Sequence, residues 1–172
     1  HGLFGYSLPP RELVKTIEER LLNHYDWSID PSWIIWLPGM VPGLNIASRC
    51  VGEPGDDILT TTPIYPPFLT APGYADRNAL RYEMGFDPVL ERWTIDFDAL
   101  EQTITNKTNL FLFCNPHNPL GRIFSVEELK ETAEFCLRNN LIICSDEIHC
   151  DLLLEPSKSH IPIATLSPDI AD

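Results

Sequence analysis

The sequence predicts an α/β fold in which a mainly parallel sheet is flanked by helices. Short apolar runs, typical of strands that are buried on both faces, alternate along the chain with helical patterns. Two of these runs stop abruptly at polar residues, at Asn115 and at Asp146. The segment between them is long enough for the right-handed crossover that joins parallel strands, so we expect the two strands to lie close together in the sheet.

The N-terminal part of the chain is predicted to be mostly helical. Pro9 and Pro10 open an amphipathic helix whose apolar face consists of Leu13, Val14, Ile17, Leu21 and Leu22. The apolar run at 33–37 predicts a strand or a buried turn of helix. The sequence PGMVPGL then interrupts the pattern, and Pro42 is expected to begin a short helix that continues to Val51.

The remaining chain is predicted to alternate between strands and helices. Strands are expected at residues 57–62, 78–84, 109–114 and 141–145. A loop with a short helix is expected at 65–74, and a helix at 96–104 with Asp96 or Asp98 near its N-cap. Ser125 and Glu128 have the spacing of a capping box, which predicts a helix that runs to about Asn140.

Composition excludes several classes of protein. The chain has 172 residues, a size typical of one domain, and a formal net charge of -13, which disfavours nucleic acid and anionic membranes as partners. No apolar run is long enough to span a membrane, and the first residues lack the pattern of a secretion signal. The five cysteines have no C-x-x-C spacing, so we expect structural, reduced thiols and a cytoplasmic protein.

The polar residues that follow the last predicted strand raise a question of function. Asp146, Glu147 and His149 come directly after LIICS, and carboxylates at the end of a buried strand are costly without a partner. In parallel sheets ligands bind beyond the carboxyl ends of the strands. We therefore expect these three residues to share one crevice with the polar side chains after the 109–114 strand, which are Asn115, His117 and Asn118.

Two explanations for this acidic strand end meet difficulties. A metal site would use Asp146, His149, Cys150 and Asp151, but no second cluster has zinc-ligand spacing, and His117 would have to complete the set alone, so we expect no metal. A nucleotide-hydrolysis site would read D-E-x-H as the helicase form of a Walker B box. That reading requires a glycine-rich phosphate loop ending in Lys and Ser or Thr, and the sequence contains none.

The third explanation is a cofactor with a cationic ring, for which pyridoxal 5'-phosphate (PLP) is a candidate. Its ring nitrogen must stay protonated, and a buried carboxylate such as Asp146 secures this. The glycine turn before the 42–51 helix offers backbone N–H groups to a phosphate. Asn118 could donate to the 3-oxygen of the ring, and Tyr65, which follows the 57–62 strand, could supply an aromatic platform.

These motifs together resemble a known family. NPHNPLG followed by SDEIH is similar to the fold-type I PLP enzymes of the class I/II aminotransferase superfamily. HGLFGYS, PGMVPGL and TPIYPPF resemble its branch of cystathionine β-lyase-like (PatB-type) C–S lyases. The resemblance covers essentially the entire chain, and it implies that residues 1–172 form a PLP-binding, transferase-like large domain.

The resemblance implies a role for several residues. Asp146 would pair with the pyridine nitrogen, Asn118 would bond the 3-oxygen, and His149 would lie near that oxygen, where the C–S lyase branch carries histidine. The other cofactor contacts would be Tyr65 on the ring, the backbone of Gly39, Met40 and Val41 on the phosphate, and Tyr6 on the phosphate of a neighbouring subunit. A contact between subunits implies a homodimer.

Most of these residues also have an ordinary structural interpretation. Asn118 could shape a proline turn, and Asp146 could cap a helix. Tyr65 and Tyr6 could be half-buried aromatics, and His149 could be a core histidine. Glu147 is expected to be structural.

The resemblance also implies what the chain lacks. The lysine that binds the cofactor covalently is expected beyond Asp172, because Lys158 lies only 12 residues after Asp146 and is predicted to be a surface loop residue. The chain is thus expected to be a truncated large domain without the small C-terminal domain, and inactive alone. The parent protein is expected to release pyruvate, ammonia and a thiol from cystathionine or another cysteine S-conjugate. The alternatives are a PLP-dependent aminotransferase and a catalytically inactive binding or regulatory module.

Overall fold

The computed structural model describes Gly5 and residues 8–171, and the chain divides into two compact units, residues 1–36 and residues 37–172. The first unit contains α1 (Arg11–Tyr25) and a 3-10 turn, η1 (Pro31–Trp33). The helix predicted after Pro10 is confirmed, and it ends at Asp26 in the left-handed conformation. The strand or buried helix predicted at 33–37 is wrong. The backbone here pairs with no described strand, and Ile35 is 78% exposed.

The second unit is built on a four-stranded parallel sheet with the order β2-β1-β5-β6. The strands are β1 (Asp57–Thr62), β2 (Asn78–Glu83), β5 (Thr108–Cys114) and β6 (Ile142–Asp146). All four strands predicted in this part of the chain are confirmed to within one or two residues. β1 and β5 are the most deeply buried of them, because each lies between two strands and is covered on both faces.

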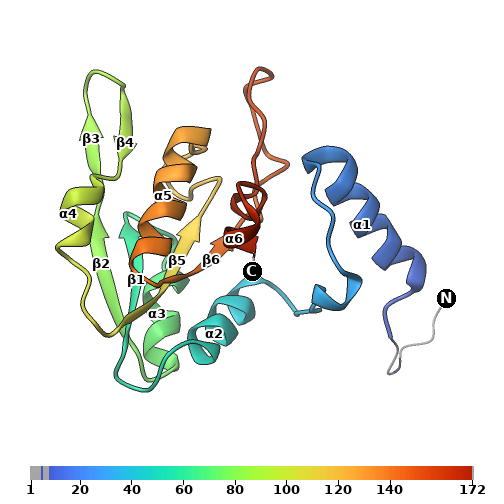
Figure 1. Cartoon of the computed structure of the whole chain (residues 1–172), viewed down its shortest axis with the longest axis horizontal. Helices are drawn as coiled ribbons and strands as arrows, with labels where there is room; N and C mark the ends of the chain where they lie inside the picture. Colours follow the sequence, from blue (N-terminus) through green and yellow to red (C-terminus); the bar gives the residue numbers. More distant parts are fainter. Residues whose placement is uncertain (1–4, 6–7, 172) are drawn as a thin grey trace. The chain divides into compact units, whose positions relative to one another are not determined.

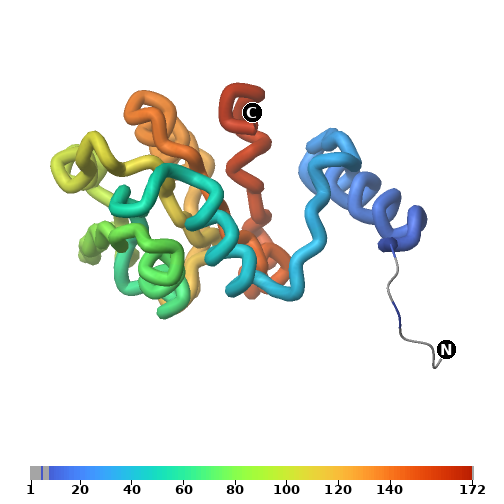
Figure 2. Tube along the Cα trace, turned by 90° about the horizontal axis from the view of Figure 1, so that it is seen from below, coloured from blue at the N-terminus to red at the C-terminus, as the bar shows by residue number. Residues whose placement is uncertain are grey.

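Helices cover both faces of this sheet, as the alternating side chains of the strands require. Ile58, Leu110 and Leu112 point to one face, where they pack with Leu44 of α2 (Met40–Cys50) and Phe68 of α3 (Pro67–Tyr74). Side chains one position along each strand point to the other face, against α4 (Phe97–Glu101) and α5 (Val126–Arg138). Figures 1 and 2 show α3 and α5 on opposite sides of the strands. The predicted α/β fold class is confirmed.

The helix ends follow the capping chemistry of the sequence. The side chain of Asp96 accepts a hydrogen bond from the Ala99 N–H at the start of α4, and Ser125 and Glu128 form the expected capping box of α5. α4 is shorter than predicted and ends at Glu101. α2 begins at Met40, two residues before the predicted start at Pro42.

An antiparallel hairpin of β3 (Gly85–Asp87) and β4 (Arg92–Thr94) was not predicted, because strands of three residues are too short to show periodicity. Asp87 closes its turn by accepting hydrogen bonds from the N–H groups of Val89 and Leu90 at 2.8 and 3.0 Å. The chain continues after β6 through a turn and a long loop to η2 (Ile163–Thr165) and α6 (Pro168–Ala171). Among the described helices, none combines the length and apolar character needed to cross a bilayer.

Candidate cofactor-binding site

The two polar strand ends are neighbours at the carboxyl edge of the sheet. Cys114 of β5 lies opposite Asp146 of β6, and the Asn115 N–H donates a hydrogen bond of 3.1 Å to the Asp146 carbonyl oxygen. The predicted closeness of these strands is therefore confirmed. The polar residues of both strand ends emerge at this edge.

Asp146 is a buried carboxylate without a strong cationic partner in the described part of the chain. Its side chain accepts a single hydrogen bond there, from the Ile148 N–H to Oδ1 at 3.1 Å. Burial raises the pKa of this carboxyl group, and the Ile148 N–H and the nearby His149 lower it by less. The alternative that Asp146 caps a helix is wrong, because residues 148–151 form a turn. A cation that reached this carboxylate would relieve an unfavourable charge.

Asn118 and Tyr65 meet beside this strand end. The Tyr65 N–H donates a hydrogen bond of 3.1 Å to the Asn118 carbonyl oxygen. The side-chain amide of Asn118 makes no hydrogen bond with a described residue, whereas the Oδ1 atom of buried Asn115 accepts one from the Phe124 N–H. Of these two side chains, that of Asn115 is bonded within the loop, and the Asn118 amide has no partner among the described residues. The Tyr65 residue is 42% exposed, so part of it is accessible.

The N-terminus of α2 offers unpaired backbone donors. Gly39 precedes the helix with φ 137° and ψ 171°, a conformation that favours glycine, and no side chain caps the helix. Pro42 has no N–H, and the Gly43 N–H bonds the Gly39 carbonyl oxygen, so the free donors are the N–H groups of Met40 and Val41. Because α2 leads through a loop into the amino end of β1, its own N-terminus lies toward the carboxyl edge of the sheet.

Two histidines lie close to Asn118 in different environments. His149 is half-buried and lines the same open pocket as Asn118. His117 is buried, and burial, with a smaller contribution from Arg122, lowers the pKa of its imidazole to about 4. Its two ring nitrogens have no hydrogen-bond partner among the described residues. His117 is therefore neutral at pH 7, which does not suit a phosphate ligand.

Glu147 has the structural role expected for it. Its carboxylate accepts hydrogen bonds from the Ser145 hydroxyl at 2.8 Å and the Ile163 N–H at 3.1 Å, and it pairs with His160 at 2.8 Å. These contacts hold the chain at 160–163 against the end of β6. The predicted surface position of Lys158 is confirmed, since Lys15, Lys107, Lys130 and Lys158 are all exposed.

The other predicted positions add little to the site. The five cysteines are free, and burial raises the pKa of the Cys114 and Cys144 thiols to about 11, so these two are protonated at neutral pH. Within the part of the chain that the structure describes, no three His, Cys, Asp or Glu side chains gather as metal ligands would. Tyr6 lies outside the described residues.

Comparison with known proteins identifies the class of this fold and site. The family model described as Aminotransferase class I and II matches residues 4–171. The chain therefore belongs to the class I and II aminotransferase family, whose enzymes depend on PLP, and the predicted family is confirmed.

Individual similar proteins include a cystathionine β-lyase, the activity of the predicted branch. The chain is 38% identical to cystathionine β-lyase PatB of Bacillus subtilis over 176 residues, covering 100% of this chain and 44% of the relative. A crystal structure of OvoB superposes with a TM-score of 0.93 at 42% identity, covering 99% of this chain and 45% of that one. Cystalysin from Treponema denticola, in a crystal structure that contains PLP, superposes with a TM-score of 0.91 at 33% identity, covering 99% and 43%. The chain thus spans less than half the length of these proteins.

The donor set fits PLP on chemical grounds. A buried carboxylate with a raised pKa suits a protonated ring nitrogen, an amide without a partner suits the 3-oxygen, and an uncapped helix N-terminus suits the phosphate. The structure brings Tyr65, Asn118, Asp146 and His149 to the carboxyl edge of one sheet. Sequence reasoning missed Arg122, which lines the same pocket as Asn118, and the second role of Glu128, which pairs with Arg122.

Proposed function

We propose that this chain is part of the cofactor-binding large domain of a PLP-dependent C–S β-lyase. Its substrate would be cystathionine or another cysteine S-conjugate, which with water would give pyruvate, ammonia and a thiol. The observation that supports this most strongly is the buried Asp146 carboxylate at the same edge of the sheet as Asn118 and Tyr65. The similarity to a cystathionine β-lyase and to cystalysin supports the choice of reaction.

Each residue of the site would have a defined task. When bound, PLP supplies a cationic ring that takes up negative charge developing at the α-carbon of an amino acid. Asp146 would hold a proton on the ring nitrogen, and the Asn118 amide would donate to the 3-oxygen. Tyr65 would contact the ring face, and the Met40 and Val41 N–H groups would bind the phosphate. His149 would lie near the 3-oxygen.

The proposal includes parts outside the described site. The lysine that holds the cofactor would lie beyond Asp172, because the four lysines of this chain are exposed. Tyr6 would reach the phosphate bound by a second copy in a homodimer. Buried, protonated thiols agree with a reduced protein in the cytoplasm.

A second candidate keeps the cofactor but transfers the amino group to a keto acid. It is favoured by the family itself, which is named for aminotransferases. The products separate the two reactions, since a lyase releases pyruvate and a thiol without an amino acceptor. An aminotransferase instead needs a keto acid as the second substrate.

The test begins with the encoding gene. A lysine after a serine, within a few tens of codons past Asp172, is expected. The whole protein should then form pyruvate and a thiol from cystathionine without any keto acid. Turnover only when a keto acid is added would favour the aminotransferase. A reading frame without such a lysine would contradict the enzyme and favour a binding module.

A further inference from the structure

The loop that carries Asn118, residues 116–121, is closed at its base by Arg122. The His117 N–H donates to the Arg122 carbonyl oxygen at 2.7 Å, and the Gly121 N–H donates to the His117 carbonyl oxygen at 2.9 Å. Asn118 lies inside this closed loop, and its carbonyl oxygen binds the Tyr65 N–H. The position of Arg122 therefore affects two of the residues assigned to the cofactor.

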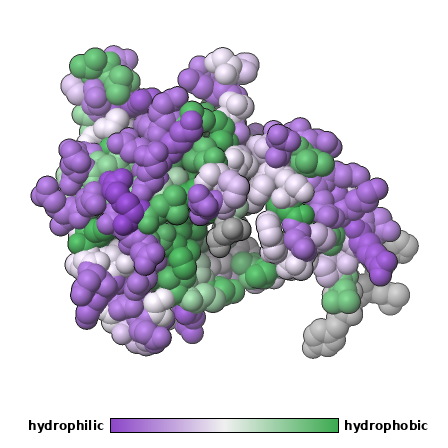
Figure 3. Space-filling view, viewed as in Figure 1, coloured by the Kyte–Doolittle hydropathy of each residue, from purple (hydrophilic) through white to green (hydrophobic). Residues whose placement is uncertain are grey.

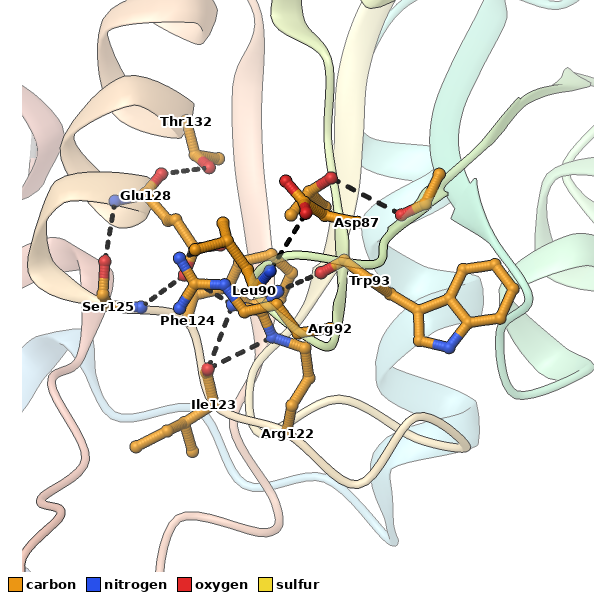
Figure 4. A network of polar contacts seen from close by, with 12 residues as sticks. Asp87, Leu90, Arg92, Trp93, Arg122, Ile123, Phe124, Ser125, Glu128 and Thr132 are labelled. Atoms are coloured by element: carbon orange, nitrogen blue, oxygen red, sulfur yellow. Dashed lines mark hydrogen bonds and ion pairs between the residues drawn. The ribbon is translucent and has the colours of Figure 1, made fainter.

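The side chain of Arg122 ties this loop to two other elements (Figure 4). Its guanidinium donates to the Trp93 carbonyl oxygen in the β3–β4 hairpin and to the Glu128 carboxylate in α5. It also donates to the Ile123 carbonyl oxygen at 3.2 Å and lies 4.3 Å above the ring of Phe124. Only 11% of this side chain is exposed, so water screens the contacts weakly.

Glu128 is a rigid anchor for the guanidinium. Its carboxylate accepts the Ser125 N–H at 2.8 Å as part of the capping box, and its other oxygen lies 3.9 Å from Arg92. The next residue, Leu129, is fully buried against the sheet, which fixes this turn of α5. Because Glu128 accepts from both Arg122 and the helix cap, the loop and α5 cannot move independently without losing hydrogen bonds.

We infer that Arg122 and Glu128 form a positioning pair that fixes the Asn118 loop, and through it the group that binds the 3-oxygen of PLP. This inference rests on the proposed function. Arginine is required because one planar guanidinium reaches three acceptors and stacks on Phe124, which a lysine ammonium cannot do. Arg122 lines the same pocket as Asn118, but its guanidinium is bonded to Trp93, Ile123 and Glu128, so both residues of the pair would act through Asn118.

The test uses the protein encoded by the whole reading frame, loaded with PLP. Three variants are compared with the unaltered protein. They are Arg122→Lys, Asn118→Ala, which serves as the reference, and the double variant that combines the two substitutions. A matched control is Arg138→Lys. Arg138 forms an ion pair of 2.9 Å with Glu101 and lies at the C-terminal end of α5, the helix that also carries Glu128. The readouts are the dissociation constant of PLP, the pH midpoint at which the absorption of bound PLP changes, and the unfolding temperature.

Arg122→Lys is expected to weaken PLP binding about tenfold, the loss that follows when one hydrogen bond to a bound group is broken. The pH midpoint should move upward, as in Asn118→Ala, because the amide stabilises the deprotonated 3-oxygen. In the double variant the midpoint should equal that of Asn118→Ala alone. Arg138→Lys should leave binding and midpoint unchanged. If Arg122→Lys does not fold, Glu128→Gln, which retains an oxygen for the helix cap, should show the same upward shift.

The outcomes separate this inference from the function on which it rests. A midpoint for Arg122→Lys or Glu128→Gln equal to that of the unaltered protein, while Asn118→Ala shifts it, would overturn the positioning role alone. So would a shift in the double variant that is the sum of the two single shifts. An unaltered protein that does not bind PLP would overturn the proposed function and this inference together.

Discussion

At the end of β6, two neighbouring carboxylates have opposite environments. Glu147 is satisfied by a hydroxyl, a backbone N–H and His160, whereas Asp146 is buried with one hydrogen bond in the described chain. Structural carboxylates are normally satisfied as Glu147 is. The poorly satisfied one is the better candidate for binding a ligand, because perturbed groups gather at functional sites.

Asp146→Asn is expected to stabilise the protein without PLP while it weakens PLP binding. Burial raises the pKa of this carboxyl above its ordinary 3.8, so the folded state holds a proton more tightly than the unfolded chain. Stability therefore falls as pH rises above 3.8, and asparagine removes that loss. PLP affinity should drop by roughly a hundredfold or more, as when one partner of a buried ion pair is removed. Urea unfolding at pH 7 and PLP titration measure the two effects. Equal PLP affinity would contradict the assignment.

The lowered pKa of His117 predicts that the protein loses stability in mild acid. Burial lowers the pKa of its imidazole from 6.5 to about 4, so between these values the unfolded chain binds a proton that the folded chain does not. The free energy of unfolding should fall by up to about 1.4 kcal/mol for each pH unit from 6.5 down to about 4. His117→Asn should flatten this dependence in urea unfolding. If the free energy of unfolding depended on pH in the same way for the unaltered protein and His117→Asn, the lowered pKa of His117 would be contradicted.

At the scale of the element, the middle of α2 packs in the core, and its first turn is free to bind an anion. Leu44 and Ser48 are buried in its middle, while its first turn is exposed and uncapped. The packing holds the helix in place, and the free N–H groups then lie where the macrodipole favours an anion. The glycine turn at Gly39 allows the chain to enter the helix without a side chain over those donors.

Gly39→Ala is expected to destabilise the protein by roughly 1–3 kcal/mol and to weaken phosphate binding, because φ 137° is strained for any residue with a Cβ. Gly43→Ala is the matched control inside the same helix. Its Cβ would meet the ends of two flexible side chains, the Leu37 methyl at 3.4 Å and Met40 Cε at 4.0 Å, so stability should stay equal or rise by about 0.5–1 kcal/mol. Thermal unfolding and PLP titration of both variants test this. Identical behaviour of the two would argue against a strained turn.

At the scale of the whole molecule, charge and exposed apolar surface oppose each other. Hydrophobic side chains reach the surface between hydrophilic ones in Figure 3, including the tip of the β3–β4 hairpin, where Val89 and Leu90 are exposed. Further exposed apolar residues in the range 37–172 include Met40, Val41, Ile46, Ile142 and Ile148. The formal net charge of -13 keeps copies of the chain apart.

The 172-residue chain is therefore expected to self-associate more as salt is raised. Salt at about 0.5 M shortens the Debye length to below about 5 Å and screens the repulsion, while apolar contacts remain. Sedimentation velocity at low and high salt, over a range of protein concentrations, should show a mass that rises with both. A monomer under all conditions would show that the exposed apolar side chains do not drive contact between copies.

Some features of the site could be predicted from local patterns and others could not. Asp146 was recognisable because a carboxylate follows an apolar strand, and Asn118 because of the N-P-L-G stretch beside it. The sequence could not show that the Asn115 side chain is occupied and that of Asn118 is not, since the deciding contact comes from Phe124. The strand or buried helix turn predicted at 33–37 was wrong, because an apolar pattern does not show whether a neighbouring strand exists to pair with it.

By itself, the sequence determined the order of the four parallel strands and of the helices between them, the two polar strand ends and the helix caps. These depend on side-chain periodicity, turn chemistry and bonds between residues a few positions apart. Only the tertiary structure decided that Arg122 bonds both the hairpin and α5, that Glu147 is satisfied and Asp146 is not, and that His117 is neutral. Those properties arise from burial and from contacts between residues far apart in the chain, which exist only once the sheet has assembled and its loops have packed.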